Sequence, residues 1–171
     1  MKTRKKNTNK IPKAVYIAAA ICLASFIFLA VSLGMESSRV GKFVPPEFDP
    51  AAQSGTPEVS EELGWSQVWQ QGMDFKAAVC GIVMLENGKA DIYFSNLEGG
   101  AWLKLRAMDE AGNILGETGL IRPGEYLRSV SLDPVPEDGA PITLKIMAYE
   151  PETYYSLGSV LLDTTVTTRG E

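Results

Sequence analysis

The distribution of hydrophobic and polar residues divides the chain into parts with different periodicities. Residues 14–33 form an apolar run of 20 residues without a charge, a proline or a glycine. At the helical rise of about 1.5 Å per residue, this run spans roughly 30 Å, the thickness of the hydrocarbon core of a bilayer. The pattern therefore predicts one transmembrane helix, which we assign to residues 14–35.

From residue 73 onward, apolar and polar positions alternate with a period of two, which is typical of strands with one buried face. The clearest case is residues 142–149, whose even-numbered side chains are apolar and expected inside. Residues 101–108 alternate in the same way, with Trp102 on the face opposite the leucines. Asn87-Gly88 predicts a tight hairpin, because this pair readily supplies the positive φ values of a type I′ turn.

Seven or eight such strands follow one another at intervals of roughly 8–14 residues, separated by turns rich in Gly, Pro and Asn. This spacing predicts an all-β domain at residues 73–168. The architecture that fits best is an antiparallel, immunoglobulin-like β-sandwich of 7–8 strands.

Residues 36–72 are expected to form an extracellular stalk or linker. Residues 43–50 (FVPPEFDP) are dense in proline, which fixes φ and favours an extended chain over helix or sheet. The aromatic side chains of Phe43 and Phe48 leave a second arrangement open, in which this segment packs along the surface of the domain.

Charge changes sharply between these parts. Residues 1–13 carry six cations and no acid, whereas residues 36–171 carry all 21 acids and ten cations, a net charge of −11. The basic tail predicts a cytoplasmic amino terminus and an extracellular carboxyl-terminal domain in the plasma membrane. The acidic domain argues against nucleic acid as a partner, since phosphate contacts require clustered Lys and Arg. A cleaved signal peptide, ending near Ala30-Val31-Ser32, is the alternative to a permanent span.

The side chains needed for most catalysis are missing. The chain has no histidine, which excludes Ser-His and Cys-His catalysis and histidine ligation of metals. Of its two cysteines, Cys22 lies within the predicted span and Cys80 in the extracellular part, so they are not expected to pair. We therefore expect no catalytic residue, no bound metal and no cofactor, and a protein that is not an enzyme.

Aromatic residues are the candidates for binding a partner. Trp65 and Trp69 would share one face of a short helix at spacing i, i+4. Tyr149, Tyr154 and Tyr155 surround a loop that also contains Pro and Glu, and exposed tyrosines of this kind offer rigid, amphipathic contact area. In both cases, burial in the core is the alternative.

Two strings, residues 102–126 and 145–154, resemble uncharacterised single-span membrane proteins of Gram-positive, clostridial-type bacteria, and the resemblance covers most of residues 43–167. It implies an envelope location and no known activity. The leading hypothesis is a membrane-anchored protein-binding or assembly module in the cell envelope, within a secretion or conjugation apparatus. The alternative is a module that binds cell-wall polymer or carbohydrate.

Overall fold

A computed structural model describes residues 21–26, 43–69, 72–73 and 75–169. The chain divides into two compact units, Met1–Val44 and Pro45–Glu171. In the first unit, residues 21–26 form an α-helix. The rest of the predicted span and the basic tail lie outside the described residues. Within the described ranges, no helix has the length and apolar character needed to cross a bilayer.

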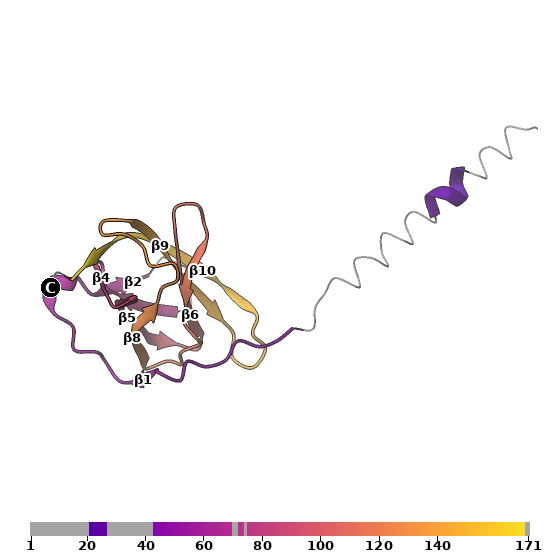
Figure 1. The fold of residues 1–171 in the computed structure, drawn as a ribbon. Helices are drawn as coiled ribbons and strands as arrows, with labels where there is room; N and C mark the ends of the chain where they lie inside the picture. Colours follow the sequence, from indigo (N-terminus) through magenta and orange to yellow (C-terminus); the bar gives the residue numbers. More distant parts are fainter. Residues whose placement is uncertain (1–20, 27–42, 70–71, 74, 170–171) are drawn as a thin grey trace, which may run out of the picture. The chain divides into compact units, whose positions relative to one another are not determined.

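The described part of the second unit contains ten strands and one short 3-10 helix, which confirms the all-β class (Figure 1). In chain order these elements are β1 (Gln53–Ser54), η1 (Glu61–Leu63), β2 (Ser66–Val68), β3 (Phe75–Val79), β4 (Val83–Glu86), β5 (Lys89–Gly99), β6 (Trp102–Met108), β7 (Ile114–Glu117), β8 (Glu125–Ser131), β9 (Pro141–Tyr149) and β10 (Ser156–Thr168).

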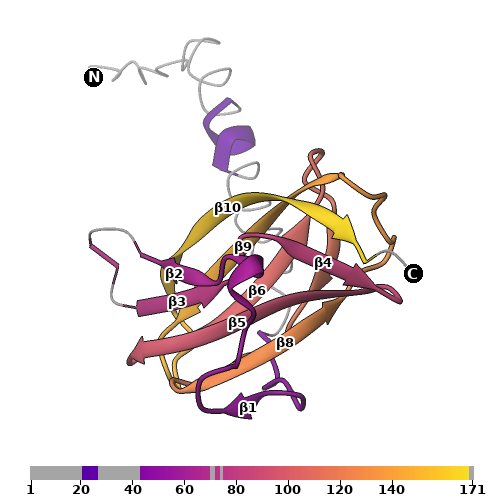
Figure 2. The same ribbon diagram turned by 90° about the vertical axis from the view of Figure 1, so that its left-hand side faces the viewer.

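The strands form one curled sheet in the order β1-β8-β5-β4-β10-β9-β6-β7, with β3 paired to β5 and β2 to β3 (Figure 2). All pairs are antiparallel except β4 and β10, where Val83 lies opposite Val166 in a parallel register. The expectation of a purely antiparallel sheet is therefore wrong at this pair. The cause is the length of β10, whose first part pairs with β9 and whose last residues lie beside β4.

The sheet curls around a hydrophobic core to which nearly every strand contributes. In β9 the even-numbered residues 142–148 are buried and the odd-numbered ones are not, as the alternation predicts. A hydrogen bond connects β7 with the segment that follows β8: the amide of Asp133 donates to the carbonyl of Leu115 at 2.6 Å. Gly116 allows this approach, because a Cβ at that position would overlap the carbonyl oxygen of Ser131.

The Asn-Gly hairpin is confirmed between β4 and β5. Asn87 and Gly88 have φ values of 51° and 73°, and Glu86 pairs with Lys89 across the turn. The following strand is long, and β5 continues through residues 96–99. These residues stay extended because β3 pairs along them in the order Phe75 to Ala78.

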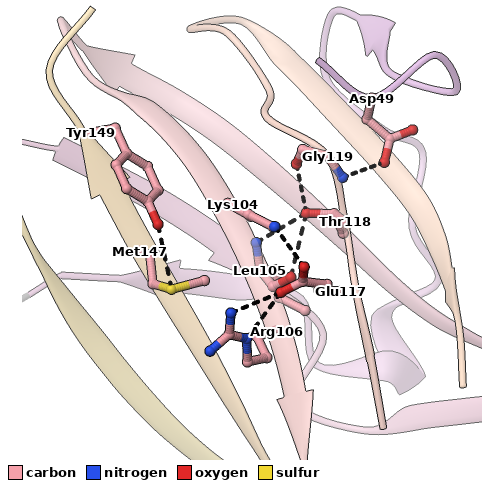
Figure 3. Close-up of polar contacts among 9 residues, drawn as sticks. All are labelled: Asp49, Lys104, Leu105, Arg106, Glu117, Thr118, Gly119, Met147 and Tyr149. Atoms are coloured by element: carbon pink, nitrogen blue, oxygen red, sulfur yellow. Dashed lines mark hydrogen bonds and ion pairs between the residues drawn. The ribbon is translucent and has the colours of Figure 1, made fainter. Parts of the chain in front are cut away.

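Residues 45–56, which we call the strap, belong to the second compact unit and pack along its sheet. The amide of Leu120 donates to the carbonyl of Glu47, and the amide of Asp49 donates to the carbonyl of Leu120, both at 2.9 Å. The Asp49 carboxylate accepts the amide of Gly119 at 2.8 Å (Figure 3). The strap then forms β1 against β8. The proline-rich segment is therefore packed along the domain surface from residue 45 onward, which is the second of the two arrangements that the sequence leaves open.

Candidate functional site

The loop between β9 and β10, residues 150–155, is folded by its own hydrogen bonds, and we call it the tyrosine loop. The amide of Glu150 donates to the carbonyl of Tyr155 at 2.8 Å, and the amide of Tyr154 donates to the carbonyl of Glu150 at 3.0 Å. The Thr153 hydroxyl donates to the Glu150 carboxylate at 2.6 Å. Glu152 and Tyr154 have φ values of 67° and 59°, a region that non-glycine residues rarely adopt. The hydrogen bonds hold a strained backbone in one conformation.

Ring contacts fix the tyrosine loop to the sheet. The Tyr154 ring meets the Trp102 ring edge-on, with centroids 5.3 Å apart. Trp102 meets Phe48 of the strap in the same manner at 4.8 Å. The guanidinium of Arg122 lies 3.7 Å from the centre of the Phe48 ring, a cation–π contact. These four side chains, the ring stack, connect the strap, β6 and the tyrosine loop.

In this arrangement Tyr155 is exposed to solvent. Its side chain is 73% exposed, although the residue before it is anchored on Trp102. Two more large apolar side chains on β10 are exposed, Leu157 at 42% and Leu161 at 59%. The loop and the adjoining strand therefore present apolar surface to solvent, with the phenol group of Tyr155 as a polar tip.

Tyr149, at the end of β9, supports the loop from the sheet. It is half-buried and lies opposite Trp102 on one side and Ser156 on the other. Its hydroxyl donates to the sulfur of Met147 at 3.7 Å (Figure 3). These contacts make Tyr149 a packing residue at the base of the loop, next to the ring stack.

Charged side chains occupy the same face further along β6. Glu117 on β7 bridges Lys104 at 2.7 Å and Arg106 at 2.9 Å (Figure 3). Partial burial alone would raise the pKa of Glu117, but hydrogen bonds and attraction from the two cations lower it below the ordinary value. Lys145 lies opposite Arg106 on β9. Three cations with one bridging carboxylate thus adjoin the ring stack.

The two tryptophans proposed with these tyrosines lie in another part of the sheet. Residues 66–68 form β2 rather than a helix, so Trp65 and Trp69 do not share a helical face as the i, i+4 spacing predicted. A strand forms because β2 pairs with β3. The indole N–H of Trp65 donates to the carbonyl of Tyr93 at 3.0 Å, and Trp69 is 53% exposed.

The structure therefore brings together Tyr149, Tyr154 and Tyr155 at the β9–β10 loop, whereas Trp65 and Trp69 flank β2. It adds Trp102, Phe48 and Arg122, which the sequence does not identify as site residues. For Trp102 a signal exists, because the alternation in β6 places a large aromatic on the face opposite the buried leucines. Phe48 and Arg122 carry no comparable signal, since their contact depends on how the strap docks.

The arrangement is suited to binding through surface contacts. Among the residues that the structure describes, no three His, Cys, Asp or Glu side chains gather in a way that could hold a metal ion. Cys80 is buried, and burial together with the charge of Asp91 raises the pKa of its thiol to about 11, which makes it a poor nucleophile.

A scan of the chain against protein-family models finds no match, and a search among curated proteins finds none either.

Proposed function

We propose that this chain is a non-enzymatic protein-binding module, anchored in the plasma membrane by one amino-terminal span with its β-domain outside the cell. The uncharged run at residues 14–33 and the six cations before it support the span and its orientation. The net charge of −11 on residues 36–171 supports a domain held away from the anionic bilayer surface.

We further propose that the curled sheet is an immunoglobulin-like sandwich. The run β3-β5-β8 matches the A-B-E order of that fold, and β10-β9-β6 matches G-F-C. β1 occupies the edge position of strand D beside β8, although it comes first in the chain. With this assignment the tyrosine loop occupies the F–G position, which lies among the binding loops of antibody variable domains. That comparison is an analogy of fold, and the site itself has to carry the function.

The observation that carries the proposal is the exposure of Tyr155 on a loop that is otherwise rigidly held. A tyrosine on a pre-ordered backbone contributes contact area with little loss of conformational freedom on binding. Leu157 and Leu161 are exposed on β10, the strand that follows the loop. Lys145 lies opposite Leu161 on β9, and Arg106 lies opposite Lys145 on β6. A central apolar anchor with a charged border is the usual composition of a protein interface.

The partner that fits this surface is another protein of the cell envelope. The resemblance of residues 102–126 and 145–154 to single-span membrane proteins of clostridial-type bacteria supports a role in an envelope assembly, such as a secretion or conjugation apparatus. In such an assembly the span would retain the module at the membrane while the tyrosine loop binds the partner.

Affinity capture from solubilised membranes tests this function. We expect the full chain to retain a specific protein, and Tyr155→Ser to weaken that interaction about 30-fold, as is typical of an interface hot spot. The matched control is Ile114→Thr, which changes another exposed apolar side chain, 49% exposed on β7, and should leave capture unchanged. Equal capture by all three proteins, or binding only to purified cell wall, would reject the proposal.

A further inference from the structure

A concave surface lies on β1, β5 and β8, none of which flanks the tyrosine loop. It is an open hollow of about 460 Å³. Its lining contains Gln53, Pro57, Glu58, Tyr93, Tyr126 and Arg128. Two aromatic rings and several planar polar groups therefore surround one surface depression.

Tyr93 reaches this hollow through a bulge in β5. The register passes from Asp91 opposite Ser129 to Phe94 opposite Leu127, so Ile92 and Tyr93 together face only one residue of β8. Ile92 is fully buried, whereas Tyr93 lies among the residues that line the hollow. The extra residue thus re-aims the tyrosine away from the core, as bulges beside functional sites do.

The backbone of Tyr93 is strained and held in place by neighbours. Its φ is 44°, which is rare for a bulky side chain. The indole of Trp65 and the hydroxyl of Ser95 both donate to its carbonyl, each at 3.0 Å. A strained residue that two hydrogen bonds stabilise is more typical of a functional position than of a connecting segment.

The polar groups of the hollow are also oriented in advance. Arg128 forms an ion pair with Asp91 at 3.1 Å, and its guanidinium lies 5.9 Å from the centre of the Tyr93 ring. The Tyr126 hydroxyl donates to the side-chain oxygen of Gln53 at 2.8 Å, which leaves the amide nitrogen of Gln53 as a donor. The side chain of Arg128 remains 57% exposed and open to a ligand.

The charge of the hollow selects the kind of ligand. Asp91 neutralises Arg128, and Glu58 adds a further negative charge, so phosphate and carboxylate groups are not attracted. Neutral sugars satisfy the same groups: their C–H faces pack on tyrosine rings, and pairs of neighbouring hydroxyls bind planar amide, guanidinium and carboxylate groups. We propose that the hollow formed by Tyr93, Tyr126, Arg128 and Gln53 is a binding site for a neutral saccharide.

Calorimetric titration of the full chain in lipid nanodiscs tests this site, since maltoside detergents would themselves supply sugar. The probes are cellotetraose and chitotetraose, with tetragalacturonate as an anionic comparison. We expect at least one neutral tetrasaccharide to bind with a Kd of about 0.1–1 mM, a range typical of shallow sites, and the anionic one to bind at least about tenfold more weakly.

Tyr93→Gly is the decisive variant, because glycine accepts the positive φ while the ring is lost. We expect it to melt no lower than the original chain and to bind the sugar at least about tenfold more weakly. Tyr126→Phe, which removes only a hydroxyl, provides a second test of the same site. We expect it to lower the affinity for the sugar about threefold.

Tyr155→Ser is the matched control, and it should bind the tetrasaccharide normally even if the tyrosine loop proves to have no protein partner. No binding of either neutral sugar at about 10 mM would overturn the proposal. Undiminished binding by both Tyr93→Gly and Tyr126→Phe, or tighter binding of tetragalacturonate, would overturn it as well.

Discussion

Cys80 follows β3 and is 1% exposed. Burial, and to a smaller extent the negative charge of Asp91, raises the pKa of its thiol to about 11. At pH 8 only about one thiol in a thousand would then be ionised, and the thiolate is the reactive form. We therefore expect iodoacetamide to leave Cys80 unmodified in the folded chain and to alkylate it after denaturation.

Mass spectrometry of the alkylated protein checks this expectation, with Cys22→Ser used so that one thiol remains. Alkylation of Cys80 in the folded protein at the rate of a free cysteine would show that the residue is accessible.

Glu117 makes a second prediction at this scale. Because hydrogen bonds from two cations lower its pKa below the ordinary 4.5, its ionised form stabilises the fold at neutral pH. That stabilisation is lost as the pH falls through the lower folded pKa. We expect Glu117→Gln to reduce the free energy of unfolding at pH 7 by about 0.5–1 kcal/mol, a small value because the carboxylate is partly exposed.

Urea unfolding of both proteins at pH 7 and at pH 3 provides the measurement. The difference should be smaller at the acidic pH, because protonation of Glu117 removes the charge that the two cations stabilise. A difference of the same size at both pH values would show that the ion pairs do not cause it.

At the scale of the elements, docking of the strap requires a glycine. A Cβ on Gly119 would lie 2.5 Å from the backbone nitrogen of Asp49, which is too close for any side chain. We expect Gly119→Ala to displace the strap, to lower stability by about 1–3 kcal/mol and to expose residues 45–56 to proteases. Gly100→Ala is the control, since nothing lies within 4 Å of a Cβ there. Equal protease resistance of Gly119→Ala and the original chain would contradict the steric argument.

The elements that the sequence predicts best are those in which local pattern and fold agree. The alternation in β6 and β9 and the hairpin at Asn87-Gly88 depend on neighbouring residues, and all three are confirmed. The bulge at Tyr93 and the docked strap depend on contacts with residues far along the chain. Periodicity does not contain that information.

In the candidate site, too, some features follow from neighbouring residues and others depend on contacts between distant parts of the chain. Tyr149, Tyr154 and Tyr155 come from one loop, so their proximity follows from the sequence. The ring stack joins Phe48, Trp102 and Tyr154, which are distant in the chain. Pairing of β6 with β9 brings Trp102 to the tyrosine loop, and docking of the strap adds Phe48. The helical spacing of Trp65 and Trp69 does not reveal that β2 pairs with β3, because that pairing depends on residues outside the segment.

At the scale of the whole molecule, the span is the feature to test first. If residues 14–35 anchor the protein, its membrane-bound form retains them and has the mass of the unprocessed chain. Intact-mass measurement on purified membranes checks this. A mature protein that begins just after residue 32 would instead establish a cleaved signal peptide.

Orientation makes a separate prediction. Protease added outside intact cells should remove the β-domain and leave the basic tail, because six cations before the proposed span favour a cytoplasmic amino terminus. Protection of the domain until the cells are lysed would reverse the topology.

Photo-crosslinking from position 155, in intact cells that naturally carry the chain, tests the central claim most directly. A photoreactive phenylalanine analogue replaces Tyr155 in one strain and Val135, which is 55% exposed elsewhere on the domain, in another. We expect a covalent adduct with one envelope protein from position 155 and none from position 135. Absence of a protein adduct at 155, or the same adducts from both positions, would contradict it.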